Sequence, residues 1–519
     1  MNHNITKLLN LLNKNRFELY NDWLEIGSIL YNLDKNLLDT FVTFSKCSPT
    51  YREGSCEYNW TDLLLNSQKA DISCLHTLAK NDDPDGYLIY IADTLLEKYN
   101  FTDLSEQNLN DILFHIFGYE YMRIGTQIWY HFNNHKWSKC ETEHVTNNMY
   151  SIFKNICQVI VKNEKNLAKI NIVKNILQKM YQHINGNKYN RGTTNNKFMK
   201  DSIYDIIFDT NTNLLGFENG VYELDKKYFR IGYPSDYVTM STNYEYTIID
   251  PNDEKLCILN NIISTYFPDP NEKENMMTYI ASCLDGQNKL IDQWYGGLGK
   301  STFCNLVSTV LGDYVLHSAN NMFSDKDFGF DVLARNIKGT RLVITQDFET
   351  VQLLELFLLN KGIKVDYDDL KQYHNIFQND PYSKSLFENK KQKSFLYGRN
   401  LYENGNFFPI SHNILMISPS LPIIECAKHI ENYAESFINN INHVQFKSKF
   451  VEHPQNDNEY KIDHEMYNKI QSYKQEFMWV LLNKYYQLYK NGIVHRKPME
   501  RIVTMVNTKP DKYKRRLAK

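Results

Sequence analysis

Apolar positions in the first 80 residues recur at helical spacing, three or four residues apart. They are Ile5, Leu8, Leu9 and Leu12, then Leu19, Trp23, Ile26, Leu30 and Leu33. This pattern predicts amphipathic helices in a small helical unit, with Trp23 and Trp60 as core anchors. Pro, Gly and Ser punctuate residues 44–60, which predicts a connecting turn, and the polar segment KNDDPDG (80–86) predicts a first boundary.

Residues 87–200 continue the helical period, most clearly at 90–99 and 152–163. Between these stretches, QIWYHFNNHKW (127–137) is rich in aromatic residues and reads as β-structure. The polar segment 183–196 predicts a linker or an exposed turn. This part of the chain is therefore expected to be helical with a β insertion.

Beyond residue 200 the pattern changes to short strands and turns over 204–250, followed by a helix at about 272–286 that ends at Gly286. Residues 287–450 alternate strands and helices, as an α/β nucleotide-binding core does. RLVIT (341–345) and ILMIS (414–418) are its clearest apolar strands. The fold class predicted is multi-domain α/β, with helical N-terminal modules before the α/β core.

Four modules are expected: helical 1–85, helical then short-stranded 86–255, a core at 256–455, and a C-terminal helical segment with a basic tail at 456–519. A length of 519 residues agrees with three or four domains, and 42% hydrophobic residues are enough to build cores. The net charge of −3 gives no global basic field, so any nucleic-acid site has to be a local patch.

Nine cysteines without a CxxC pair favour reduced thiols in a cytosolic compartment. The N-terminus lacks the apolar region of a signal peptide, and no run approaches 18 apolar residues. The sequence therefore predicts a protein that is neither secreted nor inserted in a membrane.

The sharpest chemical signal is WYGGLGKSTFCNLVSTVL (294–311), in which glycines precede Lys300 and an apolar-periodic helix. A phosphate loop needs glycines so that backbone N–H groups can face phosphate. It also needs a Lys for the β- and γ-phosphates and a hydroxyl for Mg²⁺ at a helix N-terminus. The candidate ATP-binding residues are Gly296, Gly297, Gly299, Lys300, Ser301 and Thr302. The full spacing GxxxxGK[ST] wants Gly where Trp294 stands, so the loop is about two residues short.

An acidic strand end is the second requirement, because carboxylates hold Mg²⁺ and polarise water. RLVITQDFET (341–350) supplies an apolar strand followed by Asp347 and Glu349.

These motifs occur in order with LLGFENGVYELD (214–225), MMTYIASCLDG (276–286) and GRNLYENGNFFP (398–409). The chain thereby resembles the primase–helicase family of nucleocytoplasmic large DNA viruses, the poxvirus-type superfamily 3 helicases. Residues 20–60 are similar to the module that follows the primase domain in that family. The resemblance extends over about residues 1–450.

The resemblance implies an AAA+-like hexameric ring that uses ATP and Mg²⁺ to translocate on single-stranded or forked DNA for genome replication. By that analogy Lys300 binds phosphate, Ser301 and Asp347 hold the metal, and Glu349 polarises water. The chain begins at the post-primase module, so no primase activity is predicted, and a separate primase is a possible partner. The expected location is the host cytoplasm or a viral replication factory.

Four departures from the family pattern count against a working motor. One is the short loop, and another is Pro419, which stands where the family carries a sensor Asn. Gln392-Lys393-Ser394 replaces a Gly-Gly-Asp, and Asn439-Asn440 replaces paired arginines. A trans arginine finger contributes roughly 10³–10⁵ in rate. After the phosphate loop, Arg399 is the one arginine placed to replace it, since Arg335 and Arg341 flank the acidic strand's start and the others lie near the tail.

A basic run between the acidic strand and the sensor strand is the candidate DNA contact. Lys390, Lys391 and Lys393 are interleaved with aromatic residues, which suits single-stranded DNA. The alternative is a solvated charged loop. His131, His135, Cys140 and His144 lack regular zinc spacing and are interpreted as structural residues.

Three functions stay open. The first is an active helicase, the second is a catalytically impaired paralogue that acts as a DNA-binding or assembly subunit, and the third is a non-replicative NTP-binding structural protein. The short loop, Pro419 and Asn439-Asn440 are the features that discriminate among them.

Overall fold

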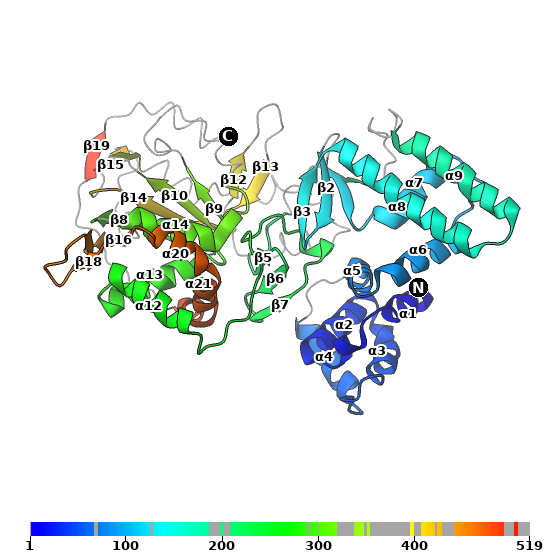
Figure 1. Cartoon of the computed structure of the whole chain (residues 1–519), viewed down its shortest axis with the longest axis horizontal. Helices are drawn as coiled ribbons and strands as arrows, with labels where there is room; N and C mark the ends of the chain where they lie inside the picture. Colours follow the sequence, from blue (N-terminus) through cyan, green and yellow to red (C-terminus); the bar gives the residue numbers. More distant parts are fainter. Residues whose placement is uncertain are drawn as a thin grey trace. The chain divides into compact units, whose positions relative to one another are not determined.

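The computed structural model describes most of the chain, in two compact units. The described residues are 2–66, 71–124, 128–185, 198–200, 208–287, 290–297, 299–318, 337–346, 350–352, 395–398, 406–420, 423–427, 441–492 and 503–506. The first unit contains the described residues up to 200 together with 233–237, and the second contains the other described residues (Figure 1).

The first unit opens with a helical region. Its helices are α1 (Asn2–Leu9), α2 (Tyr20–Leu33), α3 (Leu38–Ser45), α4 (Ser55–Asn66), α5 (Ile72–Asp82) and α6 (Pro84–Lys98), with short 3₁₀ turns at Lys14–Phe17 and Lys35–Leu37. The indole of Trp23 stacks on Phe41 at 5.0 Å, and Phe41 in turn lies 5.7 Å from Trp60. Both tryptophans are buried, so the prediction that they anchor this core is confirmed.

Two local expectations for this region were wrong. Residues 55–60 of the predicted turn form the start of α4. Leu19 caps α2 from outside the helix and is 60% exposed, because the buried stripe begins only at Trp23.

The second half of the first unit combines a sheet with long helices. It contains α7 (Glu106–Phe117), β1 (Tyr121–Ile124), β2 (Ile128–Asn133), β3 (Lys136–Cys140), α8 (Thr142–Asn163), α9 (Leu167–Asn185) and β4 (Met199–Lys200). The strand order is β3-β2-β1-β4, and β2 and β3 form a hairpin whose two-residue turn, Asn134 and His135, has positive φ. The predicted β piece is thus confirmed.

The second unit is built on a five-stranded parallel sheet. Its strands are β8 (Ile291–Gly296), β9 (Val315–His317), β10 (Leu342–Gln346), β14 (Asn413–Ile417) and β16 (Ile441–Phe446), in the order β16-β8-β14-β10-β9. The two strands predicted at 341–345 and 414–418 are therefore present, each shifted by one residue.

Helices and small sheets surround this core in Figure 1. The helices are α12 (Glu254–Tyr266), α13 (Pro270–Ser282), α14 (Lys300–Leu311), α20 (Met466–Ser472), α21 (Lys474–Val480) and α22 (Tyr486–Lys490), with a π-helical turn η6 (Leu481–Tyr485) and a 3₁₀ turn η4 (Gly312–Tyr314). The smaller sheets are β5 (Leu214–Phe217), β6 (Gly220–Glu223) and β7 (Tyr228–Arg230); β11 (Thr350–Gln352), β15 (Ile423–Ala427) and β19 (Val503–Val506); β12 (Phe395–Gly398) and β13 (Asn406–Pro409); and β17 (Lys449–Val451) and β18 (Glu459–Lys461).

One hydrophobic core joins strands β8, β10 and β14 to helices α12, α13, α14, α21 and α22. The molecule is therefore mixed α/β, with a helical N-terminal region and a parallel five-stranded sheet. No helix among the described residues is long and apolar enough to cross a membrane. The eight cysteines whose side chains are described are free thiols.

Candidate functional site

A strand, a glycine turn and a helix form the centre of the candidate site. β8 ends at Gly296 and α14 begins at Lys300. Gly296 has φ +97° and Gly299 has φ +100°, in the left-handed region that favours glycine. The local sequence therefore folds as the phosphate-loop pattern predicts.

Gly299 is also required by packing. A Cβ atom there would lie 2.8 Å from Cε2 of Phe450 and 2.9 Å from Cε1 of Tyr266. These two rings, 4.9 Å apart, close directly over the N-cap of α14. Any side chain at this position would displace them, so backbone strain and contact both select glycine.

The backbone N–H groups of the first two glycines are already engaged. Gly296 N–H donates to the carbonyl of Pro419 at 3.2 Å, and Gly297 N–H donates to the carbonyl of Phe446 at 2.9 Å. These bonds tie the loop to the ends of β14 and β16. In this conformation Gly296 and Gly297 shape the loop, and their amides do not face an anion.

The N-terminus of α14 supplies the donors that a phosphate needs. The first hydrogen bond within the helix runs from Phe303 N–H to Gly299 O at 3.0 Å, which leaves the four preceding N–H groups, those of residues 299–302, without helical partners. Ser301 is exposed and Thr302 is half-buried. Such a helix terminus attracts anions.

Lys300 bridges the loop. Its Nζ donates to the carbonyl oxygens of Gly296 at 2.5 Å and Gly297 at 2.6 Å. The ammonium group is therefore held against the carbonyls of its own loop, just before the first turn of α14. It can interact with an anion bound there.

The ends of the parallel strands lie at one edge of the sheet, which is where ligands of open α/β folds bind. Gln346 of β10 pairs with Ile417 of β14, and Ile417 pairs with Trp294 of β8. Gln346 Nε2 also lies 3.9 Å from Cys304 Sγ on α14. The segment after β10 thus starts at the edge that carries the glycine loop. Asp347 and Glu349 themselves lie outside the described residues.

Two buried polar side chains that the sequence analysis missed lie at the sensor position: Ser418 directly follows β14, and Gln293 reaches it from the neighbouring strand β8. Gln293 Nε2 donates to Ser418 Oγ at 2.8 Å, and the Ser418 hydroxyl donates to the carbonyl of Ser420. Ser418 N–H donates to Trp294 O at 3.1 Å. Pro419 therefore contributes its carbonyl to Gly296, while Gln293 and Ser418 fix the turn that carries it. The available signal was the polar pair Asp292-Gln293 between the apolar residues of β8.

A polar cavity of about 210 Å³ adjoins the loop between β16 and α13. Tyr295, His443, Gln445 and Lys447 line it, and Gln445 Cγ lies 3.3 Å from the position of a Cβ on Gly296. Burial lowers the pKa of His443 to about 4, so the imidazole is neutral near pH 7.

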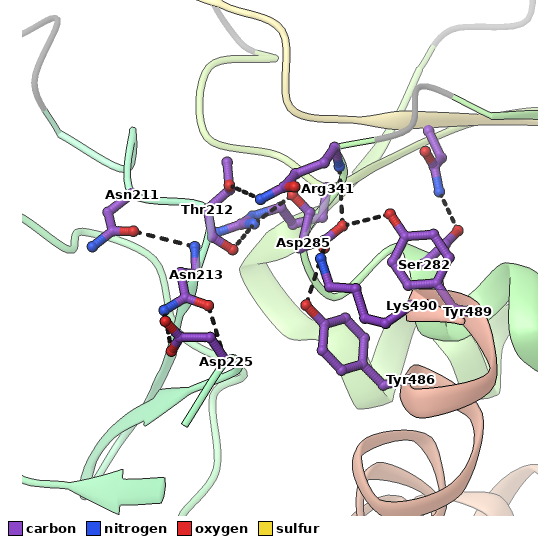
Figure 2. A network of polar contacts seen from close by, with 12 residues as sticks. Asn211, Thr212, Asn213, Asp225, Ser282, Asp285, Arg341, Tyr486, Tyr489 and Lys490 are labelled. Carbon is purple, nitrogen blue, oxygen red and sulfur yellow. Dashed lines mark hydrogen bonds and ion pairs between the residues drawn. The ribbon is translucent and has the colours of Figure 1, made fainter. Parts of the chain in front are cut away.

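Arg341 has a structural role. Its guanidinium is buried and donates to the carbonyls of Thr212 (2.8 Å), Asp285 (2.9 Å) and Leu214 (3.1 Å) (Figure 2). The side chain therefore ties the start of β10 to β5 and to the end of α13. It is not available as a trans arginine finger.

The same cluster holds the C-terminal helix. The buried carboxylate of Asp285 accepts hydrogen bonds from the hydroxyls of Tyr486 (3.0 Å) and Tyr489 (3.1 Å), and Lys490 Nζ lies 2.6 Å away (Figure 2). Burial, and then the negative charge of Asp285, raises the pKa of both tyrosines well above the usual value.

Several predicted residues lie outside the described part of the chain: Arg399, the basic residues Lys390, Lys391 and Lys393, Arg335, Gln392-Lys393-Ser394 and Asn439-Asn440. Antiparallel pairing of β12 with β13 flanks Arg399 in sequence. Of the histidines considered for zinc, His131 stacks on Tyr121 at 4.2 Å. The described residues contain no cluster of three or more His, Cys, Asp or Glu side chains that could hold a metal ion.

Comparison with family models identifies two regions. Residues 115–294 match the model described as "D5 N terminal like", and residues 5–79 match "Primase C terminal 2 (PriCT-2)". The chain therefore contains both regions.

Comparison with curated proteins finds distant viral homologues. A protein named "Putative helicase" from Acanthamoeba polyphaga mimivirus is 26% identical over 544 residues, covering 94% of this chain and 51% of the relative. Proteins of the same name from Invertebrate iridescent virus 3 and Invertebrate iridescent virus 6 are 26% and 23% identical, over 59% and 73% of this chain and 38% and 47% of their own lengths. The chain thus spans about half or less of these relatives.

Among solved structures, the apo form of the NrS-1 C terminal region aligns with a TM-score of 0.36 and 10% identity. The alignment covers 72% of this chain and 68% of that one.

Proposed function

We propose that this distant homologue of the large-DNA-virus helicases is itself an ATP-dependent DNA helicase of superfamily 3. The observation that carries the proposal is the strand–glycine loop–helix unit of Gly296, Gly299 and Lys300, at the sheet edge where the β10 strand also ends. The homology supplies the class of reaction, and the site supplies the residues that would perform it.

Nucleotide binding is assigned to the N-terminus of α14. Phosphate oxygens would accept from backbone N–H groups in the first turn of α14, such as those of Ser301 and Thr302. Lys300, whose Nζ is bonded to the Gly296 and Gly297 carbonyls, would exchange these bonds for the phosphate charge. Gly296 and Gly297 keep the loop tied to Pro419 and Phe446.

The donor set fits a magnesium ion beside the phosphates. The exposed Ser301 hydroxyl in the first turn and Asp347 after β10 are the oxygen ligands proposed, and Mg²⁺ would neutralise charge that develops on the transferred phosphoryl group. Glu349 is proposed to orient the attacking water. At the position of Pro419, the family carries an Asn side-chain amide. We propose that the polar side chains of Gln293 and Ser418, which fix this turn, take its place.

Ring assembly and DNA contact complete the proposal. β14 lies between β8 and β10, the arrangement expected of an AAA+-like core, and a homo-hexameric ring is proposed from the family resemblance. Arg399 is proposed as the finger that reaches a neighbouring subunit, since Arg341 is committed to its own fold. Lys390, Lys391 and Lys393 are proposed to contact single-stranded DNA. A separate primase partner, a location in the host cytoplasm or a replication factory, and the four-module division are part of the same proposal.

A catalytically impaired subunit is the second candidate. It is favoured by the engaged amides of Gly296 and Gly297, which leave fewer donors for phosphate than a full-length loop has, and by the loss of a side-chain amide at Pro419. In that case the chain would bind DNA or assemble with partners and would turn over little ATP.

The deciding experiment measures ATP hydrolysis with and without single-stranded DNA for the wild-type chain, Lys300→Ala and Lys461→Ala. Lys461 is an exposed lysine on β18 in the same unit and serves as the control. DNA-stimulated turnover that is lost only in Lys300→Ala would support the helicase. Wild-type turnover equal to Lys300→Ala, with intact circular dichroism, would refute it and favour the impaired subunit.

Arg399→Ala separates binding from hydrolysis. If Arg399 acts in trans, hydrolysis should fall by roughly 10³-fold or more while affinity for a fluorescent ATP analogue is kept. Hydrolysis near the wild-type rate would exclude that role.

A further inference from the structure

The helical hairpin of α8 and α9 carries a local charge opposite to that of the chain. Residues 142–185, from the start of α8 to the end of α9, contain six lysines and two acidic residues, Glu143 and Glu164, whereas the whole chain has a net charge of −3. Glu164 is already paired with Lys169 at 3.1 Å. The hairpin is therefore a concentrated basic feature inside an acidic protein.

Several of these lysines are exposed and uncommitted. Lys154, Lys162 and Lys174 are exposed. The structure describes residues 128–185 without a gap. Within this range, none of these three lysines forms an ion pair with a carboxylate. Turning such a lysine toward a ligand breaks no internal ion pair and therefore costs little free energy. These three side chains can therefore bind an external anion.

An aromatic pair fixes how the two helices present these charges. Tyr150 of α8 and Tyr181 of α9 meet edge to face at 4.9 Å, and Tyr181 is 51% exposed. Lys154 follows Tyr150 by four residues and Lys174 precedes Tyr181 by seven, so each lysine shares a helix face with its tyrosine. The contact between Tyr150 and Tyr181 therefore brings the lysine-bearing face of α8 next to the lysine-bearing face of α9. The two helices are antiparallel and lie side by side in Figure 1.

The remaining exposed positions of the two stripes are neutral and polar. Gln158 lies between Lys154 and Lys162 on α8, and Gln178 lies between Lys174 and Tyr181 on α9. Glu106 and Asp111 belong to α7, which contacts α9 through the hydrogen bond between His183 and Asn110. Glu143 lies in the first turn of α8, seven residues before Tyr150, so no acidic residue stands between Lys154 and Lys162 on α8 or between Lys174 and Tyr181 on α9.

We propose that this face of the α8–α9 hairpin binds single-stranded DNA outside the ATPase core. Lys154, Lys162 and Lys174 neutralise phosphates, and the exposed ring of Tyr181, braced by Tyr150, stacks on a base. Spaced lysines with interleaved aromatic rings are the features by which proteins hold single strands without reading their sequence. A helix of 19 to 22 residues is about 30 Å long, enough for several nucleotides.

The proposal rests on the proposed function only in its choice of nucleic acid, because a helicase generates single strands. It adds a contact surface in the first unit that is separate from Lys390, Lys391 and Lys393. A second surface would hold the strand while the core hydrolyses ATP.

The test compares two triple variants of the full chain by fluorescence anisotropy with a 15-nucleotide oligo(dT) and a duplex of equal length. The first is Lys154→Gln, Lys162→Gln, Lys174→Gln. The matched control is Lys14→Gln, Lys35→Gln, Lys46→Gln, which removes the same charge from exposed positions on the N-terminal helices of the same unit. ATP hydrolysis is measured on every sample.

The hairpin variant should lower the slope of log affinity against log salt by about 2 for the single strand, because each lost phosphate contact removes about 0.7. The control should change the slope little. Tyr181→Ala should weaken oligo(dT) binding by about 5- to 150-fold, the range for loss of one stacked base, without changing the salt slope.

The outcomes separate this inference from the helicase proposal. Equal slopes for the hairpin and control variants would overturn the inference even if ATP turnover is normal, and so would a wild-type chain that binds no DNA. A loss confined to the duplex would overturn the assignment to single strands. A hairpin-dependent loss of oligo(dT) binding in a chain that hydrolyses no ATP would support the inference while the helicase proposal fails.

Discussion

Replacement of Asp285 by Asn should destabilise the second unit more than any surface charge change. The carboxylate is fully buried and accepts from the Tyr486 and Tyr489 hydroxyls and from Gln287 N–H at 3.0 Å, with Lys490 Nζ at 2.6 Å. Asn keeps the shape and removes the charge. Any loss therefore reports the electrostatic content of the cluster.

The magnitude follows from the number of bonds. A hydrogen bond to a charged group contributes about 1.5–3 kcal/mol and a neutral one about 0.5–1.5, so each tyrosine contact loses about 1 kcal/mol. The NH₂ group of the new Asn side chain would also face hydrogen-bond donors and lack an acceptor, which costs about 1–3 kcal/mol. The sum is about 3–5 kcal/mol, the range measured when one partner of a buried pair is removed.

The assay is thermal unfolding followed by circular dichroism, together with amide hydrogen exchange of Tyr486–Lys490. At about 2–4 °C per kcal/mol for a unit of this size, Asp285→Asn should lower Tm by about 10 °C and speed exchange in α22. Asp463→Asn is the control, since its pair with Lys469 is exposed. A Tm equal to that of the control would show that Asp285 does not hold the C-terminal helix.

Two further predictions concern the loop and the helical region. Gly299→Ala should lower ATP affinity and stability more than Gly54→Ala. Both positions have positive φ, but only at Gly299 would the new Cβ meet aromatic rings. Equal losses of stability in denaturant titrations of the two variants would contradict this packing argument. Burial lowers the pKa of His76 to about 3, below its usual 6.5, so the unfolded state binds the proton first and stability present above pH 6.5 is lost as pH falls. The loss between pH 6.5 and 5 should be about 1.5 kcal/mol from this residue, and His76→Gln should flatten the pH dependence of unfolding by that amount; an unchanged slope would show that His76 titrates normally.

Local pattern was sufficient for the elements and for the centre of the site. The helical spacing around Trp23 predicted a helix, and the apolar run at 341–345 predicted a strand whose bounds agree within a residue or two. Both predictions succeeded because the order of apolar and polar side chains determines which face of an element is buried. Gly299 and Lys300 were found for a similar reason: the turn's backbone conformation restricts which residues can occupy it. The turn expected at 55–60 failed because helix α4 starts despite the Gly and Ser that precede it.

The sequence by itself determined that a glycine loop leads into a helix at Lys300 and that an apolar strand precedes Asp347, since both depend on neighbours along the chain. Tertiary structure decided which residues meet across the sheet. Only the order β16-β8-β14-β10-β9 places Gln293 beside Ser418 and allows the carbonyl of Pro419 to accept a hydrogen bond from Gly296 N–H. It also decided that Arg341 is buried in a carbonyl cluster and that Asp285 accepts from residues 201 to 205 positions away. Such contacts join segments that are remote in sequence. They are strong because the polar groups are buried together, and a local sequence pattern does not show which remote groups will meet.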